Sequence, residues 1–243
     1  MELLLFFYVN MVLCAIVFLE VLITFRKNSI LKLYFLLIIA SLFAMNYFAA
    51  AGVATRIQFI FAVSMRIVYV CSTMLAIVHL VSAKVPRWLI WLIALAIPII
   101  IGIRVYYYNQ IDIEKISHLP NQVFSVGSEL YAPRPVARFI IFSLAITAIS
   151  IAYYHYRLFL IRMNRESPHY RYLSRWIVSF IVPFFLLTIF GMLGNLGMFS
   201  QTISSYLFSF FNCIIMFSFL LRPGILNTGS GIGQLVGNAG SIK

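Results

Sequence analysis

The chain has 243 residues, of which 63% are hydrophobic and only 10% are charged, whereas ordinary soluble domains are about 25% charged. Its apolar residues come in long runs that the core of a soluble domain of this size cannot cover, so a soluble fold is excluded. The net charge of +12 does not indicate a nucleic-acid partner, because the basic residues lie in short connections between the apolar runs. There they meet lipid headgroups, and we expect anionic lipid on the cytoplasmic side.

Seven apolar segments reach the roughly 20 residues that a membrane-crossing helix needs. They span residues 2–25, 30–53, 57–83, 88–105, 138–158, 176–198 and 202–221. Helix is the expected structure for all of them, because lipid offers the backbone no hydrogen-bond partner and the alternation of a barrel strand is absent. The sequence therefore predicts an all-α fold, a polytopic membrane bundle of seven transmembrane helices that forms one domain at residues 1–226.

The basic residues also predict an orientation. Twelve of them follow the odd-numbered segments, the last one included, whereas five follow the even-numbered segments. Cytoplasmic connections carry the excess of Lys and Arg, so we expect the N-terminus outside, the C-terminus in the cytoplasm, and a bacterial inner (plasma) membrane as the location. Trp88 and Trp176 are expected at the cytoplasmic boundary of the bilayer, where amphipathic rings prefer to lie.

Two segments are expected outside the bundle. Residues 106–137 form a long extracellular loop of mixed polarity, which suggests a partly ordered cap. Residues 227–243 are rich in Gly, Ser and Asn, which predicts a flexible tail or a peptide that a partner orders. A protein partner is therefore expected at the tail, at the cytoplasmic loops or at the extracellular loop.

Arg66 is a charged residue inside the third apolar segment. At 1.5 Å per helical residue it lies roughly 13 Å from the outer end of that segment, where a charge is costly and normally faces the bundle interior. Tyr69 and Thr73 continue a polar stripe on the same helix face. Arg66 is either the cation that receives an anionic ligand group or a structural arginine that pairs inside the bundle or extends to the interface.

Further polar residues reach a similar depth in other segments. Asn46, Asn195, Ser209 and Asn212 all fall in the expected outer half of the bundle. Together with Arg66 they are the candidate ligand-binding residues. The alternative is that they form interhelical hydrogen bonds that only hold the bundle together.

The connection after the fifth segment is the most basic part of the chain. It is expected to contact anionic lipid or an acidic partner, or simply to determine topology, through Arg157, Arg162, Arg165, Arg171 and Arg175. We find no catalytic motif, no metal-ligand spacing and no cofactor-binding pattern. The chain is therefore not expected to be an enzyme.

The end of the last segment reads FSFLLRPGIL. Through Arg222, Pro223, Ile225 and Leu226, together with seven segments and an outside N-terminus, it resembles the N-terminal membrane regions of bacterial sensor histidine kinases and membrane-anchored AraC-type regulators. This chain lacks their cytoplasmic output domain. The resemblance implies a receptor-like sensory module that acts through a separate partner. The alternatives are an accessory subunit of a larger membrane complex and, third, a small-solute transporter.

The charge asymmetry makes the orientation testable. In a cysteine-free background, Gly127→Cys is expected to react with an impermeant thiol reagent added to intact cells, whereas Asn164→Cys is expected to react only after the cells are opened. Labelling in the reverse pattern would overturn the orientation.

Overall fold

The computed structural model describes residues 2–24, 29–52, 55–82, 85–108, 135–162, 168–195, 198 and 201–221. Within these ranges the chain is all-helical, as the sequence predicted. The helices are α1 (Glu2–Thr24), α2 (Ser29–Ala51), α3 (Arg56–Ser82), α4 (Arg87–Tyr108), α6 (Pro135–Arg162), α7 (Pro168–Asn195) and α8 (Gln201–Leu220). Each one overlaps a predicted segment, but α6 and α7 extend into the predicted basic connection, α6 as far as Arg162 and α7 from Pro168 onward.

Three helices in the described part of the chain are long and apolar enough to cross a membrane. Their apolar stretches are Leu3–Thr24, Ile30–Ala51 and Ile60–Leu80. The helices also carry many large apolar side chains on their outer surface, such as Leu5, Ile23, Trp91 and Leu95, which are all more than half exposed. Lipid rather than water suits such a surface, so the structure is compatible with a membrane protein.

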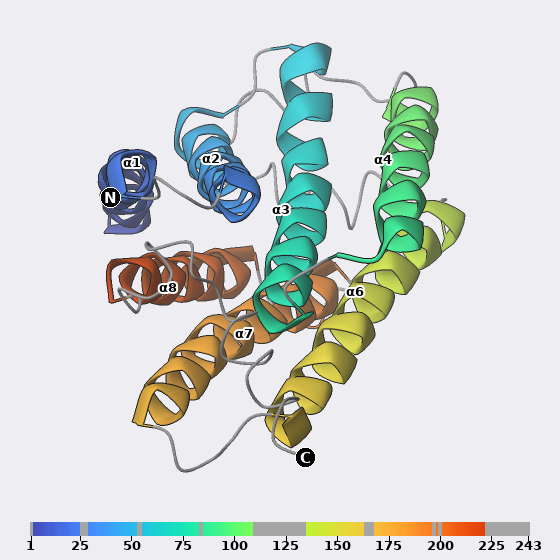
Figure 1. Ribbon diagram of the computed structural model, residues 1–243. Helices are drawn as coiled ribbons and strands as arrows, with labels where there is room; N and C mark the ends of the chain where they lie inside the picture. Colours follow the sequence, from blue (N-terminus) through green and yellow to red (C-terminus); the bar gives the residue numbers. More distant parts are fainter. Residues whose placement is uncertain are drawn as a thin grey trace.

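α3 is the central helix of the bundle. Figure 1 shows α1, α2 and α8 on one side of it and α4 and α6 on the other, and α3 packs directly against α2, α4, α6 and α7. On the first side, α1, α2 and α8 contact one another pairwise. This three-helix group contains the candidate site described in the next subsection.

The buried faces of α1 and α2 follow an alternating spacing of three and four residues. In α1 the buried residues are Phe7, Asn10, Cys14, Val17 and Val21. In α2 the series Leu31, Phe35, Ile38, Leu42, Met45 and Ala49 has the same spacing, and Ile39, Ser41, Asn46, Phe48 and Ala50 are buried beside it. This spacing keeps one narrow stripe of a helix against its neighbours, as in a coiled coil. α1 therefore buries one narrow stripe and α2 a broader face, and both present the rest of their apolar surface outward.

α3 has two buried stripes because it has neighbours on both sides. Tyr69, Ala76 and Leu80 belong to the core shared with α2, α7 and α8. Cys71 and Val78 belong to a separate core shared with α4 and α6. A helix with apolar residues all around its surface is expected to lie at the centre of a bundle, and α3 does.

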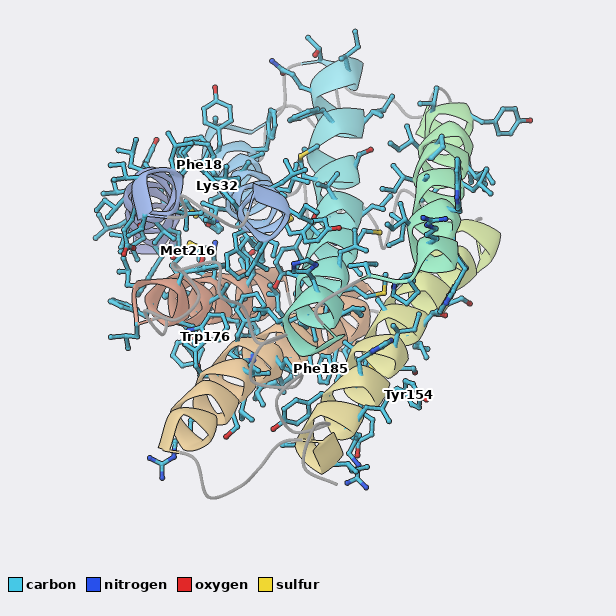
Figure 2. All side chains as sticks on the ribbon, in the orientation of Figure 1. Phe18, Lys32, Tyr154, Trp176, Phe185 and Met216 are labelled. Atoms are coloured by element: carbon cyan, nitrogen blue, oxygen red, sulfur yellow. The ribbon has the colours of Figure 1, made fainter. Side chains whose placement is uncertain are left out.

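An aromatic cluster joins α2, α7 and α8. The ring of Phe35 lies 4.9 Å from that of Phe219 and 6.3 Å from that of Phe180, measured between centroids. Trp176 stacks on Phe180 at 5.7 Å and donates a hydrogen bond of 2.6 Å from its Nε1 to the backbone oxygen of Ser218. Trp176, labelled in Figure 2, is thus buried between helices, with its indole N–H satisfied inside the bundle. We had expected it to act as an interfacial anchor.

Local interactions end α2 and begin α3. Gly52 has a φ of 75° and donates its backbone N–H to the oxygen of Phe48, which ends α2 in the left-handed conformation that glycine adopts without strain. Thr55 and Gln58 then bond reciprocally, each side chain to the backbone N–H of the other, at 3.3 and 3.2 Å. This capping box begins α3.

The aromatic cluster predicts unequal effects for two phenylalanines of α2. Phe35→Ala removes a fully buried ring and is expected to lower the free energy of unfolding by about 3–5 kcal/mol. Phe43→Ala, on the outward face of the same helix, is the matched control and should change it far less. Thermal or denaturant unfolding in detergent measures both, and equal effects would contradict the packing described here.

Candidate ligand site between three helices

The buried stripe of α8 is unusual because its first half is polar. Ser205, Ser209, Asn212, Met216 and Phe219 follow the same spacing of three and four residues as the stripes of α1 and α2, and all five are buried. The buried series of α2 that has this spacing carries Leu, Phe, Ile and Met. In α8, hydrogen-bonding side chains therefore lie at buried positions where apolar side chains would be expected.

Two apolar contacts fix how α8 runs beside α2. Phe35, near the start of α2, meets Phe219, near the end of α8. Ala49 and Ala50, at the end of α2, cluster with Phe208, in the first half of α8. The two helices are therefore antiparallel.

This direction puts Asn46 toward the same end of α2 as Ala49 and Ala50, which cluster with Phe208 of α8. Asn46 continues the stripe of Phe35 and Leu42 on α2, and it is completely buried. On α8, Asn212 lies two turns before Phe219 on the same face, and Ser209 lies one turn further. Along α2, Asn46 therefore lies beyond the Phe35–Phe219 contact, toward the end of that helix. Along α8, Asn212 and Ser209 lie on the same side of this contact.

α1 completes this group through Asn10, which sequence analysis did not single out. Its Nδ2 donates to the backbone oxygen of Ser209 at 3.2 Å, and its Oδ1 accepts from Sγ of Cys213 at 2.8 Å. The signal was present in the sequence, since Asn10 interrupts the apolar run LLLFFYVNMVLCAIVF. We refer to Asn10, Asn46, Ser209 and Asn212 as the interhelical junction.

The junction contains buried polar atoms that have no partner within the described residues. Asn46 donates from Nδ2 to the oxygen of Leu42 at 2.7 Å, which leaves its Oδ1 unpaired. Oγ of Ser209 and both amide atoms of Asn212 are unpaired as well. An unpaired buried polar group costs about 1–3 kcal/mol.

α3 carries a second set of such atoms. Oγ of Ser64, the hydroxyl of Tyr69 and Oγ1 of Thr73 are buried without a partner in the described part of the chain. The sequence predicted a polar stripe of Arg66, Tyr69 and Thr73, and Tyr69 and Thr73 are indeed interior. Arg66 is half-buried in the same stripe and already has a partner.

The structure thus groups only some of the predicted site residues. Asn46 on α2 and Ser209 and Asn212 on α8 are all buried, and the two helices contact each other. Arg66 lies on α3, whose main contacts are with α2, α4, α6 and α7, so it is not assigned to the junction. Asn195 lies at the end of α7, and its side chain is outside the described residues.

The predicted lipid-facing arginines are only partly described. Arg157 on α6 and Arg175 on α7 are exposed. Arg162 and Arg171 also lie in these helices, but their side chains, like the whole of Arg165, are outside the described set. Most of the predicted loop and all of the predicted tail lie outside it too, so their roles stay predictions.

Comparison of the chain with protein-family models, curated proteins and solved structures gives no match. The resemblance to the membrane regions of sensor kinases and AraC-type regulators therefore stays a prediction. The proposed function below therefore rests on the residues of the junction.

Two asparagines of the junction should respond oppositely to the same substitution. Asn10→Leu removes two partnered bonds and is expected to lower the free energy of unfolding by about 0.6–2 kcal/mol. Asn212→Leu removes unpaired groups and is expected to raise it by about 1–3 kcal/mol. Thermal unfolding of protein dialysed free of small molecules tests the pair, and a destabilising Asn212→Leu would show that Asn212 has a structural partner.

Proposed function

We propose that this chain is a receptor-like sensory membrane module, which binds a small molecule at the interhelical junction and acts through a separate protein partner. The observation that carries the proposal is the set of unpaired buried polar atoms on Asn46, Ser209 and Asn212. A binding site for a hydrogen-bonding ligand accounts for their position and for their lack of partners.

The contrast with other buried polar residues supports a ligand over simple helix pairing. Ser218, on the same helix, donates from Oγ to the oxygens of Ser179 and Ile214 at 3.1 and 2.9 Å. Asn10 likewise uses both ends of its amide. Polar residues that hold membrane helices together are expected to be paired in this way, and Asn212 is not.

α8 is suited to transmit the binding event. It contributes Ser209 and Asn212 to the junction, and Asn10 of α1 holds it through two consecutive turns, at Ser209 and Cys213. A ligand that pairs better with one position of α8 than with another shifts the population toward that position. In our proposal this shift reaches the partner through the segment that follows α8, which begins with Arg222 and Pro223.

The membrane frame of the proposal follows from the charge pattern. We propose that all seven helices cross a bacterial plasma membrane with the N-terminus outside. α1, α3 and α8 then begin at the outer surface, so that the junction lies in the outer half of the bilayer. A ligand would reach it from the outside, and the partner would be met in the cytoplasm.

Native mass spectrometry of protein purified gently from its own membrane tests this function. We expect a bound small molecule on the wild-type protein and on Ser218→Ala, and none on Asn212→Leu. Ser218→Ala is the matched control because it changes a partnered serine on the same helix.

Two results would contradict the receptor function. A protein subunit at fixed stoichiometry, with no small molecule on any variant, would favour the accessory-subunit alternative. Solute flux through reconstituted vesicles that Asn212→Leu abolishes would favour the transporter.

A further inference from the structure

We infer that the outward face of α6 docks a transmembrane helix of the partner protein, and that this helix carries a carboxylate at the level of Arg157 and continues into the cytoplasm. The inference rests on the proposed function, because it says where the partner of that function is met. We refer to Thr147, Ser150, Tyr154, Arg157 and Ile161 as the outer stripe of α6.

The outer stripe lies opposite the face through which α6 joins the bundle. Ala148 and Ala152, one turn apart, are buried in the two cores that α3 shares with its neighbours. Small side chains of this kind let two membrane helices approach closely. All five residues of the stripe are exposed, and Figure 2 shows Tyr154 on the side of α6 that faces away from the other helices. α6 is thus attached by one face and leaves the opposite face uncovered.

The spacing of the stripe suits a single partner helix. Its residues follow one another at steps of three and four, which keeps them on one line along the helix. α6 has 28 residues and is therefore about 42 Å long, whereas the hydrocarbon layer is about 30 Å thick. The stripe runs from the middle of α6 to Ile161, in the last turn, which is 73% exposed. In the proposed orientation, a helix that covers it crosses the membrane and extends into the cytoplasm.

The chemistry of the stripe does not suit lipid. Every exposed residue in the ranges 9–19 of α1, 33–43 of α2 and 90–99 of α4 is aliphatic or aromatic. The middle of α6 instead exposes the hydroxyls of Thr147 and Ser150, side chains through which membrane helices pair with one another. An anchor at the headgroups would explain Tyr154 and Arg157, but the two hydroxyl residues lie about 10–15 Å further from the cytoplasmic end than Arg157.

Arg157 distinguishes between the possible occupants. Its guanidinium only donates hydrogen bonds, and a carboxylate can accept two of them in parallel. A second copy of this chain is a poor occupant. Two copies inserted in the same orientation and paired through this face by a twofold axis would place their Arg157 side chains together, and like charges across an interface are unfavourable. A different helix with an Asp or Glu at this level compensates the charge.

Photo-crosslinking in the native membrane tests the inference. A photoreactive p-benzoylphenylalanine takes the place of Ser150 and, as the matched control, of Leu95, which is exposed on the outward face of α4. We expect the probe at position 150 to form a protein adduct and the probe at position 95 to react with lipid. Sequencing of the crosslinked peptide should identify a transmembrane helix of another protein with an Asp or Glu near its cytoplasmic end.

Charge reversal tests the role of Arg157 in the same adduct. Arg157→Glu should abolish the adduct, and replacing the partner's acid with Lys in that background should restore it. Arg175→Glu is the matched control, because Arg175 is an exposed arginine on α7. It should keep the adduct.

Three results would overturn the inference. An adduct of twice the mass of this chain would make the occupant a second copy. Lipid adducts at position 150, as at position 95, would show that lipid covers the face. A protein adduct that survives Arg157→Glu, or whose helix has no acid, would remove the proposed chemistry of the partner.

The ligand of the proposed function is tested separately. A small molecule that native mass spectrometry finds on the wild-type protein and not on Asn212→Leu would support that function whatever occupies α6. Conversely, an acid-dependent protein adduct at position 150, with no small molecule on any variant, would support the docking face and contradict the receptor function.

Discussion

A buried polar group in this bundle has to find its hydrogen-bond partner among the helices, because neither lipid nor an apolar core provides one. Several described residues satisfy this constraint. Trp176 reaches the backbone of α8, Asn10 bridges from α1 to α8, and Thr188 bonds to the backbone one turn before it. The same constraint makes the exceptions informative. Asn46, Ser209 and Asn212 on α2 and α8, like Ser64, Tyr69 and Thr73 on α3, keep buried polar atoms that have no partner among the described residues.

The packing of α1, α2 and α8 explains how the polar residues of the junction can be buried between these helices. Phe35, Phe180 and Phe219 form a dense aromatic contact at one end of α2 and α8. Phe7, Ala49 and Phe208 form a second apolar contact at the other end. The helices are therefore held together on both sides of the junction. Its polar residues can therefore remain unpaired without the helices separating.

The existence of the helices could be predicted from hydrophobic runs, because a long apolar segment has few alternatives to helix in lipid. The facing ends of α6 and α7 could not, because both helices continue into the polar, basic connection. Asn46, Ser209 and Asn212 could also be selected, since polar residues deep in such runs are few. Arg66 was the leading candidate for the same reason. The sequence does not show, however, that its side chain already has a partner. Asn10 was overlooked because one asparagine in a strongly apolar segment has no periodic polar neighbours. Which residues share a junction depends on the register between α2 and α8, and that register comes from contacts between residues far apart in the chain.

The bond between Asn10 and Ser209 joins residues separated by 199 positions. α2 and α3, in contrast, are joined by a capped turn of a few residues and can pair soon after they are synthesised, since local contacts form before distant ones. α1 must therefore remain without its α8 partner while almost the entire chain is made and inserted. The contact between Asn10 and α8 forms only after the last helix has been made, so a shortened chain without α8 would keep most of its helices and lose this bond.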